Sequence, residues 1–222
     1  MRARLAILVV AAGALSIAPN IRAHWEDENH WPAGSVIAMQ LQMGPSPAPL
    51  VDGNADWDAV TEAALNSWNA VLNGVAFQPV RGPAPDAASQ DGVNNVFWGD
   101  DVYGEPFGDG VLALTLSTYT VPDNATIESD VVFNRALAWN SYRGDLRRGP
   151  DGGMLYDMQR VALHEFGHVL GLDHPDDHGQ IVTAIMNSRA SNVDALQPDD
   201  IEGVAAIYTA LSATSLESAP VK

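Results

Sequence analysis

The 222-residue chain contains no cysteine and only one lysine, Lys222. Without thiols it can form no disulfide and has no cysteine nucleophile or thiolate metal ligand. Basic residues are scarce as well: 11 Lys and Arg stand against 28 Asp and Glu, a formal net charge of −17 at pH 7. Because clustered Lys and Arg bind nucleic-acid phosphates, we expect no nucleic-acid partner.

The chain also lacks an apolar run of the roughly 20 residues that a membrane-spanning helix needs. Residues 5–15 are apolar, follow Arg2 and Arg4, and precede small residues up to Ala23, a pattern typical of a secretory signal peptide. Cleavage after Ala23 is favoured over cleavage after Ala18, and an uncleaved membrane anchor is the alternative. We therefore expect residues 1–23 to be removed from a secreted, extracellular or periplasmic protein that has no membrane span after cleavage.

The rest of the chain predicts one domain over residues 24–210 and a flexible, small and polar tail over 211–222. Period-two and helical apolar patterns predict strands and helices, with loop between them. The strands are expected at 35–43, 75–80, 94–98, 111–119 and 127–133, and the helices at 56–73, 155–170 and 198–211. Asp56 suits the N-cap of the first helix, and Asp199 and Asp200 suit the positive end of the last. This order indicates an α+β fold: a mixed five-stranded sheet, a covering helix and two later helices.

Residues with metal-binding chemistry concentrate at the end of the second predicted helix, in His164-Glu-Phe-Gly-His168-Val-Leu-Gly171-Leu-Asp-His174. His164 and His168 are four residues apart and share one helix face, where both imidazoles can reach a zinc ion at about 2.0–2.1 Å. Gly171 can adopt the left-handed conformation that ends a helix, which lets His174 return as a third ligand. Three protein ligands leave one position open, which is typical of catalytic zinc.

Glu165 lies one step around the helix from His164. There it can take a proton from a water molecule whose pKa zinc lowers to about 7. The residues therefore predict hydrolysis by an activated water, with Glu165 as general base. An exposed helix with incidental histidines is the structural alternative.

The extended motif resembles that of the metzincin zinc endopeptidases, and it is most similar to the matrixin family, the matrix metalloproteinase-like catalytic domains. Met186, in Ile185-Met-Asn, matches the methionine that lies beneath the three histidines in this clan. Segment 196–208 resembles the C-terminal helix of matrixins; 110–115 and 129–134 resemble their fourth and fifth strands. The resemblance implies a metzincin-like fold with two lobes, about 24–171 and 172–210, around a substrate cleft.

The sequence departs from the matrixin pattern in three places, and the last two change what is expected of the metal sites. Pro175 follows the third histidine, as in serralysins, where matrixins usually have serine. Leu114 and Val132 stand where animal matrixins place histidines for a structural zinc, so we expect a single, catalytic zinc. Asn134 replaces an aspartate that the family uses for calcium; calcium therefore stays open there and in the acidic loop 100–109.

The resemblance also implies how a peptide or protein substrate binds. The peptide would pair through main-chain hydrogen bonds with the strand at Leu112, Ala113 and Leu114, and segment 176–195 would form one wall of the pocket beyond the cleaved bond. We expect a monomeric secreted zinc endopeptidase. A catalytically silent zinc-binding adhesion or inhibitor module and a hydrolase of non-peptide amides are the alternatives; Glu165 argues against the silent module.

Overall fold

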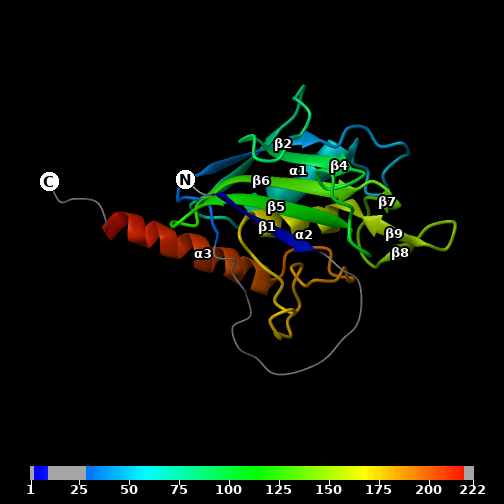
Figure 1. The fold of residues 1–222 in the computed structure, drawn as a ribbon. Helices are drawn as coiled ribbons and strands as arrows, with labels where there is room; N and C mark the ends of the chain where they lie inside the picture. The colour runs from blue at the N-terminus through cyan, green and yellow to red at the C-terminus, as the bar shows by residue number, and fades with distance from the viewer. Residues whose placement is uncertain (1–2, 10–28, 218–222) are drawn as a thin grey trace.

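The computed structural model describes residues 3–9 and 29–217 (Figure 1). Most of the predicted signal peptide, together with residues 24–28 and 218–222, lies outside the described residues. The rest forms an α+β domain in which two helices pack beneath a twisted mixed sheet and a third follows at the C-terminus. This agrees with the predicted fold class.

The large sheet contains the five strands that the sequence predicts, in a mixed arrangement. They are β2 (Val36–Gln42), β3 (Ala76–Val80), β4 (Asn94–Gly99), β5 (Ala113–Thr120) and β6 (Thr126–Asn134). β2 runs parallel to β3 and β4, β4 runs parallel to β6, and β5 is antiparallel to β6. A sixth strand, β1 (Ala3–Val9), pairs antiparallel with the outer edge of β5. β1 lies within the segment that the sequence predicts as a signal peptide.

The first helix, α1 (Trp57–Asn69), begins at the predicted N-cap. The Asp56 carboxylate accepts a hydrogen bond from the main-chain N–H of Ala59 at 2.6 Å, which satisfies one of the free donors of the first turn. Val60, Ala64 and Trp68 are fully buried along one face, as their helical spacing predicts. This face packs against the second helix, α2 (Met158–Val169).

The boundaries of the two later helices differ from those predicted. α2 begins three residues later than expected because Met154–Asp157 forms strand β9 instead. β9 pairs with β7 (Trp139–Asn140) and β8 (Arg147–Arg148), two short strands in a segment that the sequence predicts as loop. The last helix, α3 (Pro198–Glu217), runs six residues beyond the predicted end at Leu211, because no glycine or proline interrupts it there.

Buried side chains fix the position of α2 against the rest of the core. The indole N–H of Trp68 donates to the Leu163 carbonyl at 2.9 Å, and that of Trp31 donates to the Val169 carbonyl at 2.8 Å. The Tyr208 hydroxyl, on α3, donates to the Leu170 carbonyl at 2.8 Å. Carbonyls at the C-terminal end of a helix have no partner within the helix, so the last two bonds satisfy groups that would otherwise be buried unpaired. α2 is thereby a rigid support for the side chains it carries.

Candidate metal centre

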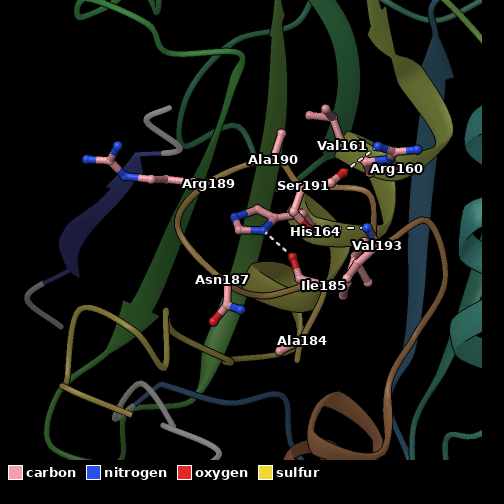
Figure 2. Close-up of a pocket in the computed structure, with 10 residues that line it drawn as sticks. All are labelled: Arg160, Val161, His164, Ala184, Ile185, Asn187, Arg189, Ala190, Ser191 and Val193. Atoms are coloured by element: carbon pink, nitrogen blue, oxygen red, sulfur yellow. Dashed lines mark hydrogen bonds between the residues drawn. The ribbon is translucent and has the colours of Figure 1, made fainter. Parts of the chain in front are cut away.

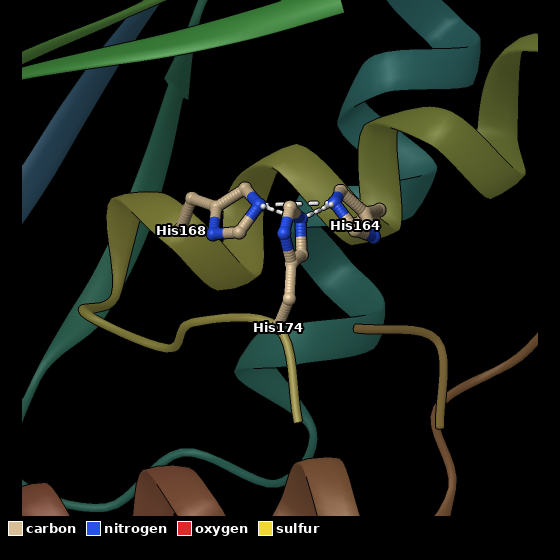
Figure 3. Close-up of side chains that lie close together, drawn as sticks. All are labelled: His164, His168 and His174. Carbon is tan, nitrogen blue, oxygen red and sulfur yellow. Dashed lines mark hydrogen bonds between the residues drawn. The ribbon is translucent and has the colours of Figure 1, made fainter. Parts of the chain in front are cut away.

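The three histidines of the motif converge on one point (Figure 3). His164 and His168 come from adjacent turns of α2, and Gly171, at φ 92°, reverses the chain so that His174 meets them from below. All three side chains are buried. Their Nε2 atoms lie 2.9 Å apart for His164 and His168, 3.0 Å for His168 and His174, and 3.1 Å for His164 and His174.

Each imidazole is oriented by an acceptor at its other nitrogen. The Nδ1 atom of His164 lies 2.8 Å from the Ile185 carbonyl, and that of His168 lies 2.7 Å from the Leu172 carbonyl. Nδ1 of His174 lies 3.1 Å from the carboxylate of Asp177. Because these partners can only accept, Nδ1 carries the proton and Nε2 a lone pair in each ring.

Three lone pairs therefore face one another, and no proton stands between them to form hydrogen bonds. Burial, with the nearby His174, lowers the pKa of His164 to about 3, and burial with its two neighbours lowers the pKa of His168 well below its usual value. Neutral imidazoles are the form that binds metals. Zinc–nitrogen bonds of about 2.0–2.1 Å place nitrogen ligands roughly 3.3 Å apart in a tetrahedral site, a few tenths of an ångström beyond the observed separations. The residues fit a zinc ion.

Acidic residues of the 100–109 loop do not form a comparable cluster. Within residues 3–9 and 29–217, the three histidines are the only group of His, Cys, Asp or Glu with three ligand atoms within 4.8 Å of one another. Asp100 instead lies 3.4 Å from Arg135, and Asp101 accepts a hydrogen bond from the Gly104 N–H. Whether this loop binds calcium, which the sequence left open, stays open.

Glu165 is completely buried beside the histidines. Its Oε2 accepts a hydrogen bond of 2.7 Å from the Thr115 hydroxyl, whereas Oε1 has no hydrogen-bond partner among the described residues. Burial raises the pKa of Glu165 to about 8, and the bond from Thr115 opposes that shift. The unpartnered Oε1 is therefore the oxygen of Glu165 that is free to take part in a proton transfer.

Met186 lies against α2, as its resemblance to the metzincin methionine implies, in a turn at residues 185–187 that we call the methionine turn. A Cβ atom added to Gly167 would stand 2.2 Å from the Met186 sulfur, so the methionine side chain touches the helix backbone between the two histidines. The turn is held by Asp200 of α3, whose carboxylate accepts the N–H groups of Ile185 at 3.0 Å and Met186 at 3.2 Å. The Ile185 carbonyl in turn accepts from His164, so α3 helps to orient a histidine of the centre.

Sequence reasoning missed the roles of Asp200, Asp177 and Thr115. Asp200 was predicted only as a favourable charge at the start of a helix, and no role was predicted for Asp177 or Thr115. The three-residue spacing between His174 and Asp177 could have suggested a hydrogen bond. Nothing in the sequence connects Thr115 with Glu165, 50 residues away.

The predicted substrate strand lies at the start of β5. Leu112 and Ala113 are buried, and the pairing of β1 with β5 begins only at Leu114. Leu114 packs in a small apolar cluster on the face of the sheet opposite α2. Its members are Val102, Val111, Leu114, Leu116 and Val132. Leu114 and Val132, the positions compared with structural-zinc histidines, thus take part in hydrophobic packing.

A pocket that is open to solvent adjoins His164 (Figure 2). It is lined by Arg160, Val161, His164, Ala184, Ile185, Asn187, Arg189, Ala190, Ser191 and Val193. Segment 184–193, within the predicted wall, supplies most of this lining. Arg160, almost fully buried, donates to the carbonyls of Ser191 and Gly144 and lies 3.5 Å from Asp157. These contacts hold its guanidinium in place beside the pocket.

A helix that carries two histidines and meets a third beyond a glycine turn, in an α+β domain with a buried glutamate beside them and a methionine below, is the arrangement of the metzincin-like metallopeptidase domains. Comparison with known families extends the identification: the matrixin family pattern matches residues 46–209, more than half of the chain. The chain belongs to the matrixin family.

Similar proteins include metalloendoproteinases of plants and collagenases of animals. Metalloendoproteinase 1-MMP of Arabidopsis thaliana is 31% identical over 153 residues, which cover 69% of this chain and 38% of that protein. Metalloendoproteinase 1 of Glycine max is 27% identical over 186 residues, 83% of this chain and 54% of the relative. Neutrophil collagenase of Homo sapiens is 43% identical over 53 residues, 24% of this chain and 11% of the human protein. The chain thus spans about half or less of the length of these relatives.

Proposed function

We propose that this protein is a secreted zinc endopeptidase in which His164, His168 and His174 hold the metal and Glu165 is the general base. The proposal rests on the three buried Nε2 atoms, which lie within 3.1 Å of one another with their lone pairs turned toward a common point. Beside them lies the buried carboxylate of Glu165, whose Oε1 has no hydrogen-bond partner among the described residues. Membership of the matrixin family and the names of the relatives support the same reaction class. Secretion rests on the signal-peptide pattern of residues 1–23.

Zinc, when bound, supplies the Lewis acidity that polarises a peptide carbonyl and brings the pKa of water to about 7. The chain supplies the proton transfers. Oε1 of Glu165 accepts the proton of the attacking water, and Glu165 then returns it to the leaving amine. Burial excludes bulk water, so this proton stays at the site.

The peptide would bind along the outer edge of β5 at Leu112, Ala113 and Leu114. Pairing of β1 with Leu114–Thr120 supports this, because it places an antiparallel strand along the same outer edge of β5. The substrate side chain next to the cleaved bond would enter the pocket beside His164. Because the fixed guanidinium of Arg160 bounds that pocket, we expect a preference for side chains of small or moderate size.

The decisive experiment replaces Glu165 by Gln, which keeps the shape of the side chain and removes the base. We expect casein cleavage to fall by about 10²–10⁴-fold while zinc content stays near one ion per chain. Glu128→Gln, which alters another buried glutamate on β6, is the matched control and should keep its activity. Equal casein cleavage by the wild type and Glu165→Gln would exclude the mechanism, and an inactive wild type that binds zinc would favour the silent binding module.

A further inference from the structure

β5 presents different groups to its two neighbours. Its outer main-chain edge is where we propose that the peptide pairs, while alternate side chains point toward α2. Thr115 is one of these and is almost completely buried. Its Oγ1 lies 2.7 Å from Oε2 of Glu165 and 3.1 Å from the main-chain oxygen of the same residue. Thr115 follows the part of β5 that is proposed to pair with the peptide, and it contacts Glu165, the proposed base.

The two oxygens of Glu165 have different surroundings. Oε2 accepts the Thr115 hydroxyl, while Oε1 is buried without a hydrogen-bond partner among the described residues. Hydrogen bonds to an ionised carboxylate are shorter and stronger than those between neutral groups. With Oε2 held, rotation of the carboxylate is restricted, and Oε1 is the oxygen that remains available to a water molecule.

We propose that Thr115 is a positioning residue for Glu165: its hydroxyl fixes one carboxylate oxygen and thereby directs the other at the attacking water. The inference rests on the proposed peptidase function. Because Thr115 directly follows Leu112–Leu114, the strand that aligns the peptide also aligns the base that acts on it. Because the base is already held in one orientation, less conformational entropy is lost when the transition state forms.

Three substitutions on β5 test this role. Thr115→Val removes the hydroxyl but keeps the shape; because it removes a hydrogen bond to a charged group, we expect kcat to fall about tenfold to hundredfold. KM should stay near the wild-type value, since the main chain that pairs with the peptide is unaltered. Thr115→Ser restores the hydroxyl and should recover most of kcat. Ser117→Ala, two residues along, removes a buried hydroxyl that contacts Ser129 instead, and should behave as the wild type.

Two further measurements separate positioning from a structural defect. Zinc content of Thr115→Val should equal that of the wild type, and on the Glu165→Gln background Thr115→Val should cause no further loss of kcat. A double-mutant cycle on the unfolding of the zinc-free protein should give a favourable coupling between Thr115 and Glu165.

Unchanged kcat in Thr115→Val, a loss not recovered by Ser, or zero coupling in the cycle would overturn the role of Thr115. Failure of the proposed function looks different: the wild type itself would not cleave peptides. In that case the unfolding cycle still decides whether Thr115 holds Glu165.

Discussion

Gly167 occupies the one position of α2 between His164 and His168 where the structure leaves no room for a side chain. A Cβ atom there would lie 2.2 Å from the sulfur of Met186 and 3.2 Å from the ring of Trp68. The helix therefore rests directly on the methionine turn, whose Ile185 carbonyl orients His164. This contact explains physically why a residue with low helix propensity stands in the middle of the motif.

Gly167→Ala should lower the free energy of unfolding, although glycine-to-alanine changes inside helices ordinarily raise it by about 0.5–1 kcal/mol. We expect a loss of about 1–3 kcal/mol, because the added methyl group overpacks the core. Chemical denaturation of the zinc-free protein measures it. In the Met186→Ala background the space is vacated, so the same change should cost much less; an equal cost in both backgrounds would mean that Met186 is not the obstacle.

At the scale of elements, the loop at residues 100–111 packs against the face of the sheet opposite α2. Apolar packing is found there at the positions that were compared with structural-zinc histidines. The apolar cluster that contains Leu114 and Val132 covers part of this face. Beside it, the Tyr103 hydroxyl donates to the buried carboxylate of Asp130 at 2.7 Å, and Asn95 donates to the other carboxylate oxygen. Packing and a buried hydrogen bond thus connect the loop, β4, β5 and β6.

Asp130 makes this connection sensitive to pH. Burial raises its pKa to about 6 from 3.8, and the bond from Tyr103 opposes the rise. Between these two values the unfolded chain has released the proton while the folded protein still holds it. The contribution of Asp130 to stability is therefore full below about pH 4 and is lost as the pH rises through about 6.

Asp130→Asn cannot titrate, so the unfolding free energy of the wild type relative to this variant should fall by up to about 3 kcal/mol between pH 4 and pH 7. Urea denaturation of the two proteins across that range measures the difference. Tyr103→Phe removes a hydrogen bond that favours the ionised carboxylate of Asp130. It should therefore raise the pKa of Asp130 further, and the unfolding free energy should continue to fall at higher pH. Parallel profiles of the wild type and Asp130→Asn would contradict the linkage.

Local patterns predicted those parts of the fold whose cause is local. Asp56 begins α1 because its own carboxylate caps Ala59, and the sequence predicted it. β9 was wrongly predicted as the first turn of α2, because its strand form depends on pairing with Trp139 and Arg147, which no local pattern reveals. The histidine site was also predicted from a local pattern, because one helix and the glycine turn that follows it bring the three histidines together. The contact of Thr115 with Glu165 depends on how a strand and a helix pack.

At the scale of the whole molecule, a chain without cysteine and with a formal charge of −17 has no covalent cross-link to offset self-repulsion. In the described residues, no helix is long and apolar enough to cross a membrane. The histidine centre joins α2 to the segment beyond Gly171, which also carries the methionine turn and leads to α3. A metal ion held there would tie together the two proposed lobes, residues 24–171 and 172–210.

Zinc should therefore stabilise the whole domain as well as supply its chemistry. An ion that binds only the folded state adds about 4 kcal/mol at a free concentration of 1,000 times its Kd, so chelation should lower the midpoint of thermal unfolding by many degrees and readdition should restore it. His174→Ala should abolish this response, because it removes the ligand from beyond Gly171. His178→Ala, which alters a histidine paired with Asp173 outside the centre, should keep it. A midpoint that does not respond to zinc in the wild type, or that responds equally in His174→Ala, would show that the three histidines do not join the lobes through a metal.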